Sequence, residues 1–240
     1  MEPEPDESKA VRSARHLHLE VTRTARVSVL GGGSESEGAR WWVLHGYRQL
    51  APRFLRRFED IATQGRKILA PEALSRFYLA PGDRSHDGRD PVGASWMTRE
   101  DRDTEIQDYV GYLDRALEDP RLDGNSPGVL RTVLGFSQGG HTAARWVALS
   151  RHRFCDRLIL WGVALPPDLP DAARERLSQL ELILVRGDSD ALRRREEEER
   201  EESTLRNWGV EWRELRHPRG HRIDGFLLRK LAGEESRATG

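Results

Sequence analysis

Short apolar runs of strand length alternate along the chain with segments whose apolar residues recur at helical spacing. Strands are predicted at 41–44, 67–70, 129–134, 158–161, 182–185 and 210–215. Helices are predicted at 50–62, 106–117, 141–150, 171–180, 193–208 and 223–231. Strands that alternate with helices predict an α/β fold, with a mostly parallel sheet covered by helices on both faces.

The N-terminal part of the chain has the alternation of apolar and polar residues that is typical of strands. Leu17, Leu19 and Val21 alternate with polar residues, and so do Val27 and Val29. This pattern predicts an antiparallel strand pair. Residues 80–95 are rich in Gly, Pro and Asp and are expected to form a loop. We expect one domain over 15–231, a disordered 1–14 and a frayed 232–240.

Composition narrows the class of protein. A third of the 240 residues are charged, yet the net charge is only −1, and arginines are spread among acids. Such a mixed surface argues against a nucleic-acid partner. Cys155 is the only cysteine, which fits a reducing compartment, and we read it as a packing residue. No run of about 18 apolar residues predicts a membrane span, so we expect a soluble, cytoplasmic protein. The charged run 193–202 reads as an exposed helix with i,i+4 ion pairs.

The most informative motif is Gly135-Phe136-Ser137-Gln138-Gly139-Gly140, which lies between a predicted strand and a predicted helix. Strand, G-x-S-x-G and helix in this order are the signature of a nucleophile elbow. Glycines are needed because side chains at 135 and 139 would collide with the neighbouring elements. The serine then stands at the start of a helix, where N–H groups favour a developing negative charge.

A nucleophilic serine needs a histidine base and an acid that orients it, and in this fold they follow the serine in the order acid, then histidine. His221 lies between the last strand and the last helix, where open α/β sheets place their sites, and we favour it over His217. Asp188 and Asp190 both follow the strand 182–185. The spacing leaves these two acids as alternatives, and the unused one is expected to cap the next helix.

Acyl transfer also requires two donors for the oxyanion. The backbone N–H of Gln138 supplies one, and the loop after an early strand should supply the other. Leu44-His45-Gly46-Tyr47 is that loop, with the N–H of Tyr47 as the expected donor. We expect His45 to have a structural role under the loop.

Four motifs resemble the phospholipase/carboxylesterase family of α/β-hydrolases, which contains small bacterial carboxylesterases and acyl-protein thioesterases. They are Leu44-His45-Gly46, the Gly135–Gly140 motif, Gly187-Asp188-Ser189-Asp190 and Gly220-His221, within residues 38–231. The resemblance implies Asp190 as the acid, no cofactor, and Trp96 in an acyl-pocket loop, with an ordinary core position for Trp96 as the alternative. The family has an apolar residue and a proline after the acid, whereas this chain has Ala191-Leu192-Arg193, which keeps Asp188 as an alternative.

The sequence therefore predicts a serine hydrolase that acts on small-molecule carboxylic esters through Ser137, Asp190 and His221. A thioesterase or dienelactone-type hydrolase with the same triad is an alternative, and a non-catalytic scaffold used for binding is another. The sequence does not indicate an oligomeric state.

Overall fold

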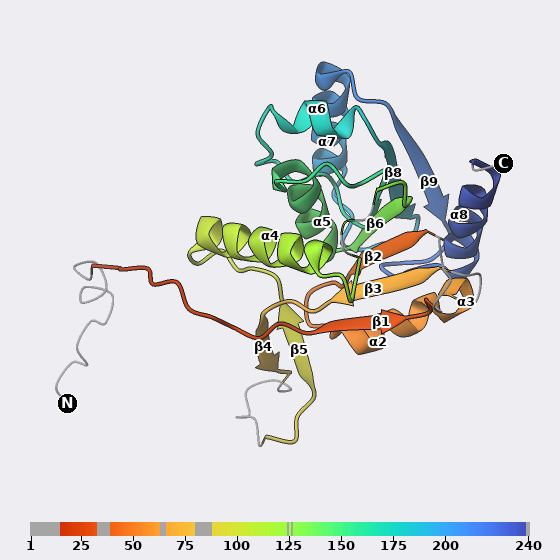
Figure 1. The fold of residues 1–240 in the computed structure, drawn as a ribbon. Helices are drawn as coiled ribbons and strands as arrows, with labels where there is room; N and C mark the ends of the chain where they lie inside the picture. The colour runs from red at the N-terminus through yellow and green to blue at the C-terminus, as the bar shows by residue number, and fades with distance from the viewer. Residues whose placement is uncertain are drawn as a thin grey trace, which may run out of the picture.

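The computed structural model describes residues 15–32, 39–62, 66–79, 88–123, 125 and 127–238. Within these residues, seven strands form one sheet in the order β1-β3-β2-β6-β7-β8-β9, and β4 and β5 form a separate antiparallel pair (Figure 1). The strands are β1 (Val27–Leu30), β2 (Arg40–Leu44), β3 (Lys67–Pro71), β4 (Ser75–Tyr78), β5 (Val92–Ser95), β6 (Arg131–Phe136), β7 (Arg157–Trp161), β8 (Glu181–Gly187) and β9 (Trp212–His217).

The helices follow the predicted segments. They are α2 (Ala51–Leu55), the 3-10 turn η1 (Arg56–Phe58), α3 (Glu59–Ala62), α4 (Arg102–Glu118), α5 (Gln138–Leu149), α6 (Ala173–Leu177), α7 (Arg195–Trp208) and α8 (Gly225–Ala238). The α/β prediction and the mostly parallel sheet are confirmed, because every pair from β3 to β9 in the sheet is parallel. The closing helix runs to Ala238, beyond the predicted end at 231. The disorder expected for 1–14 concerns residues outside the described ones.

Alternate residues of each central strand enter two different apolar clusters, which explains why these strands read as continuous apolar runs. Trp42, Leu158 and Leu184 pack with α4, α5 and α7 on one face of the sheet. Trp41 and Ile159, one residue away in their strands, pack with α2, α3 and α8 on the other face. The strands are therefore buried on both sides.

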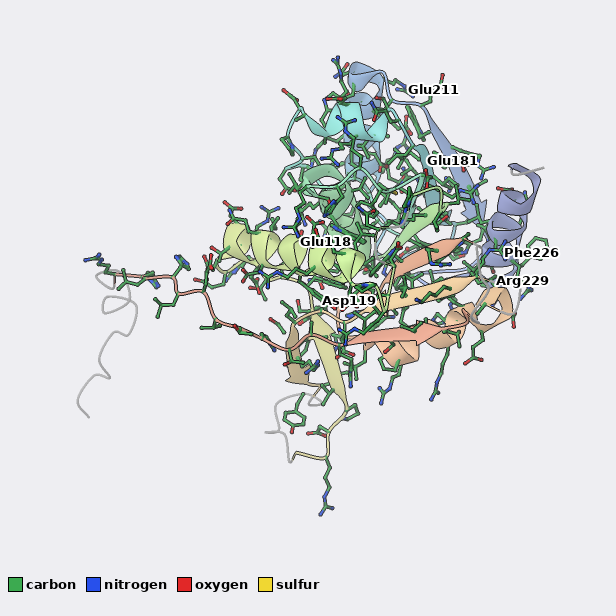
Figure 2. All side chains as sticks on the ribbon, in the orientation of Figure 1. Glu118, Asp119, Glu181, Glu211, Phe226 and Arg229 are labelled. Carbon is green, nitrogen blue, oxygen red and sulfur yellow. The ribbon has the colours of Figure 1, made fainter. Side chains whose placement is uncertain are left out.

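Helix α8 shows how an outer helix closes the second face. Leu228 and Leu231 are buried, while Phe226 on the same helix is 73 % exposed. Phe226 and Arg229 both lie on the outer side of the molecule near the C-terminal helix (Figure 2). Arg229 binds Asp60 of α3 at 2.7 Å, so an ion pair joins α8 to the neighbouring helix.

Two predictions of strand and loop are wrong. Leu17, Leu19 and Val21 are exposed and form no strand; their segment runs out from β1 as an extended arm (Figure 1). The expected strand over 27–29 is present as β1, but its antiparallel partner is β3. Residues 92–95, expected to be loop, form β5, which pairs with β4. Whether such a segment forms a strand depends on backbone pairing with a segment that is distant in sequence. The alternation of apolar and polar residues within the segment does not indicate that partner.

The predicted helix cap is also wrong. Helix α6 begins at Ala173, and no side chain caps it. Helix α7 begins at Arg195, also without a side-chain cap. Asp188, which was expected to cap this helix if unused, binds Arg216 instead.

Candidate active site

Ser137 lies at the turn between β6 and α5 with φ 54° and ψ −125°, a backbone conformation that non-glycine residues rarely adopt. The turn is held on both sides. The N–H of Ser137 donates to the carbonyl of Trp161 in β7 at 2.9 Å, and its carbonyl accepts from the N–H of Gly140 at 2.8 Å. The strained serine is thus fixed at the carboxyl end of the sheet.

The glycines of the motif are required by close contacts between backbones. A Cβ at Gly135 would lie 2.3 Å from the carbonyl oxygen of Gly139. A Cβ at Gly139 would lie 2.3 Å from the carbonyl oxygen of Leu44. Real Cβ atoms do not approach backbone so closely, and therefore both positions require glycine. The helix packs directly against the ends of β2 and β6, as the elbow signature implies.

His221 and Asp190 meet beside this turn. His221 Nδ1 lies 2.7 Å from Asp190 Oδ2, and the Asp190 side chain is only 3 % exposed, whereas that of His221 is 21 % exposed. Leu192 N–H donates to the other oxygen of Asp190 at 2.9 Å. The imidazole therefore has a fixed acid behind it and retains contact with solvent.

Three contacts place this pair near the turn that contains Ser137. The ring of Phe136, the residue before the serine, has its centroid 4.8 Å from that of His221. Gly162 follows Trp161, which holds the serine N–H, and a Cβ at Gly162 would lie 3.2 Å from His221 and 3.6 Å from Asp190. The residues at 137, 190 and 221 are far apart in sequence but converge at one edge of the sheet, where α/β folds bind their ligands.

The two alternatives to these residues have other partners. The Asp188 carboxylate lies 2.7 Å from Arg216 Nε and is about half exposed. His217 is buried, Trp161 Nε1 lies 3.3 Å from its Nε2, and the N–H of Arg219 donates to its Nδ1. Burial lowers the pKa of His217 below its ordinary value. Asp168, which follows β7, forms ion pairs with Arg102 and Arg145.

The loop at 46–49 approaches the serine from β2. A Cβ at Gly46 would lie 3.3 Å from the Cβ of Ser137. The N–H groups on either side of Tyr47 are occupied, since Gly46 donates to Gln49 Oε1 at 2.9 Å and Arg48 donates to Ala94 O at 3.0 Å. Among the described residues, no acceptor takes the N–H of Tyr47. Gln138 is the first residue of α5, where a backbone N–H has no partner inside the helix.

His45 has the structural role that the sequence predicts. It is buried, its Nδ1 lies 2.9 Å from Gly46 O, and its Nε2 accepts from the N–H of Ala73 at 3.1 Å. An Nε2 that accepts requires the proton on Nδ1, so the ring is neutral. Burial lowers the pKa of His45, although the bond to Gly46 opposes this.

Trp96 is 3 % exposed and packs in the core with Tyr109, so its position fits the core alternative. Its Nε1–H donates to His45 O at 2.8 Å. The side chain of Gln138 binds the same loop, since its Oε1 accepts from Trp96 N–H and its Nε2 donates to Met97 O. The sequence motif predicts a role for the backbone N–H of Gln138 only, whereas its side chain links the start of α5 to the loop after β5.

A buried charge network is centred on Arg186, and no pattern in the sequence predicts it. Arg186, in the strand that leads to Asp190, binds Glu201 at 2.5 Å and Glu214 at 3.0 Å. Glu201 also accepts from the N–H of Leu165 at 2.7 Å, in the loop that begins at Gly162. Glu198 and Glu201 are buried, which corrects the prediction of a wholly exposed helix over 193–202, although Arg195 and Glu199 form the expected pair. Within a run of charged residues, the sequence does not indicate which acidic side chains are buried and which are exposed.

A pocket of about 350 Å³ lies between α5, α7 and the loop after β7, and Ser137, Asp190 and His221 are not among its lining residues. His141 lines it, and burial, aided by Arg145, lowers the pKa of His141 to about 4.

Cys155 packs against the core, and burial raises the pKa of its thiol.

The described part of the chain contains no group of three His, Cys, Asp or Glu that could hold a metal ion. In that part, no helix has the length and apolar character needed to cross a bilayer.

No protein-family model matches the sequence, and neither does any curated protein. Solved structures do match. The acyl-protein thioesterase 2 of Zea mays has a TM-score of 0.65 at 16 % identity, over 90 % of this chain and all of the other. The carboxylesterase of Mesorhizobium loti has a TM-score of 0.64 at 16 % identity, over 87 % of this chain and 94 % of the other. The carboxylesterase of Bacillus cereus has a TM-score of 0.61 at 16 % identity, over 89 % of this chain and 94 % of the other. The chain therefore has the α/β-hydrolase fold, as these thioesterase and carboxylesterase structures do.

Proposed function

We propose that this protein is a serine hydrolase that cleaves carboxylic esters of small or medium acyl groups through an acyl-enzyme. The observation that carries the proposal is the 2.7 Å contact between His221 and Asp190 beside a serine at a strained strand-to-helix turn. A carboxylate on Nδ1 selects the tautomer whose Nε2 can accept a proton from a hydroxyl. The strained backbone conformation of Ser137 is retained because contacts with the neighbouring backbone hold it in place. Strain of this kind is typical of functional sites.

The chemistry follows from these groups. Ser137 Oγ attacks the ester carbonyl while His221 Nε2 takes its proton, and Asp190 stabilises the imidazolium that forms. The N–H groups of Gln138 and Tyr47 donate to the oxyanion. His221 then gives its proton to the leaving alcohol, and a water molecule activated by the same histidine releases the acid and restores Ser137. No cofactor is needed for any of these steps.

A thioesterase is the second candidate, because the fold is similar to that of the maize acyl-protein thioesterase. The same groups would act, with a thiol as the leaving group. Matched oxygen esters and thioesters of one acyl group separate the two activities, since kcat/KM for each pair reports the preference directly. The protein is expected to favour the oxygen ester.

Labelling by a fluorophosphonate tests whether the serine is nucleophilic. The wild type should be labelled and Ser137→Ala should not, while Ser178→Ala, which alters an exposed serine at the end of α6, should label like the wild type. A wild-type protein that is not labelled and hydrolyses no ester of the panel would refute the proposal and favour a binding scaffold.

A further inference from the structure

An aromatic pair stands at the loop that carries the proposed oxyanion donor. The rings of Tyr47 and Phe77 are stacked, with centroids 5.5 Å apart and an angle of 29° between their planes. Tyr47 comes from the loop after β2, and Phe77 comes from β4. Tyr47 remains 51 % exposed although Phe77 covers part of it, so aromatic surface is left facing solvent.

The β4–β5 pair is fixed to this loop through its backbone. The N–H of Arg48 donates to Ala94 O at 3.0 Å, and the N–H of Ala94 donates to Gln49 O at 3.1 Å. A Cβ at Gly93 would lie 2.5 Å from Arg48 O, so the strand and the loop are in direct contact. Arg48 itself has φ 66°, a left-handed conformation that this contact maintains. Phe77 is therefore held at a constant place relative to Tyr47.

The loop also places the pair close to the reacting serine. Gly46, the residue before Tyr47, comes so near that a Cβ there would be 3.3 Å from the Cβ of Ser137. When the carbonyl oxygen of an ester accepts the N–H of Tyr47, only the C=O bond and this hydrogen bond separate the carbonyl carbon from the donor. A substituent of the ester can then reach the ring attached to the same residue.

From this geometry we propose that Tyr47 and Phe77 form an aromatic wall, which binds an aromatic or other flat apolar group of the ester and makes aryl esters preferred substrates. The inference rests on the proposed function of Ser137 and adds the substrate class. Ring stacking contributes about 0.5–1.5 kcal/mol beyond the burial of area. Only substrates that carry such a group gain this contribution, so the wall acts on specificity.

The test compares phenyl butyrate with ethyl butyrate and benzyl butyrate with hexyl butyrate as substrates of the wild type, Phe77→Ala and Tyr47→Ala. Tyr47→Ala retains the backbone N–H. For each variant, kcat/KM for the aromatic ester is divided by kcat/KM for the alkyl ester. This ratio is then divided by the same ratio of the wild type, so that the difference between the leaving groups cancels. We expect the ratio to fall about two- to tenfold in both variants.

Tyr78→Ala is the matched control, because Tyr78 is also partly exposed but points to the opposite face of the same strand. Its ratio should equal that of the wild type, and the melting temperatures of all three variants show whether the fold is retained. Unchanged ratios in both wall variants, or an equal fall in Tyr78→Ala, would overturn the inference.

A binding measurement separates this inference from the proposed function. In Ser137→Ala, phenyl butyrate should bind more tightly than ethyl butyrate by titration calorimetry, and Phe77→Ala in the same background should remove the difference. If the wild type hydrolyses no ester but this difference is present, the proposed function fails and the wall stands. If esters are hydrolysed and labelling depends on Ser137, but both esters bind equally, the wall fails and the proposed function stands.

Discussion

His221 and Asp190 are 31 residues apart in sequence, and their side chains meet at 2.7 Å beside the turn that holds Ser137. Asp188, two residues before Asp190, faces Arg216 instead. Spacing along the chain allows both acids, whereas the fold gives each one a different partner.

Asp190→Asn should lower kcat for ester hydrolysis by about 10³–10⁴-fold, because the amide no longer holds the imidazole in the productive tautomer. Asp188→Asn is the matched control: it removes only a half-exposed ion pair, and kcat should stay within about twofold of the wild type. Rates with a chromogenic acetate ester check both. An equal loss in the two variants would show that Asp190 has no special role.

Gly139→Ala should destabilise the protein by about 1–3 kcal/mol or prevent folding, because its Cβ would lie 2.3 Å from the carbonyl oxygen of Leu44. Gly111→Ala in α4 is the control, since a Cβ there meets nothing within 4 Å. It should stabilise the protein by about 0.5–1 kcal/mol, as alanine favours a helix over glycine. Urea unfolding measures both free energies, and equal stability of the two variants contradicts the steric argument.

Glu201→Ala should cost about 3–5 kcal/mol of unfolding free energy, because it leaves the buried Arg186 guanidinium without its shortest partner. Glu199→Ala on the same helix removes an exposed pair with Arg195 and should cost only about 0.3–0.5 kcal/mol. Thermal and urea unfolding of the two variants give the comparison. Costs of similar size would mean that burial of the network contributes nothing.

Asp168 should make the free energy of unfolding depend on pH in the acid range. Burial opposes its ionisation, but hydrogen bonds from Arg145 and Arg102 outweigh burial and lower the pKa of Asp168 from 3.8 to about 2. A folded-state pKa below the unfolded value gives stability that is present above about 4 and is lost as pH falls through about 2. Because the Asp168 side chain is 29 % exposed, solvent screening reduces the contribution to roughly 1–2 kcal/mol.

Unfolding of Asp168→Asn and of the wild type at pH 5, 3 and 2 measures this contribution. The difference between them should shrink as pH falls, because the Asp168 carboxylate is progressively protonated and loses its charge. A difference that is constant over this range would exclude the linkage.

The central parallel strands, most of the helices and the elbow could be predicted from the sequence, because local patterns report burial and turn strain directly. The run 158–161 is apolar on successive residues since it contacts helices on both faces. Gly135 and Gly139 are conspicuous because any side chain there collides with backbone. The alternation at Val27 and Val29 predicts a strand but does not predict its partner β3, because pairing joins segments that are distant in sequence.

The sequence by itself determined the residue types: a serine between glycines, acids after one strand and a histidine after the next, which local periodicity and strand order suffice to place. Only the tertiary structure decided that Asp190 faces His221, that Glu201 is buried against Arg186, and that Phe77 stacks on Tyr47. Each of these contacts depends on the direction of a side chain and on the packing of separate elements. Spacing along one chain carries neither kind of information.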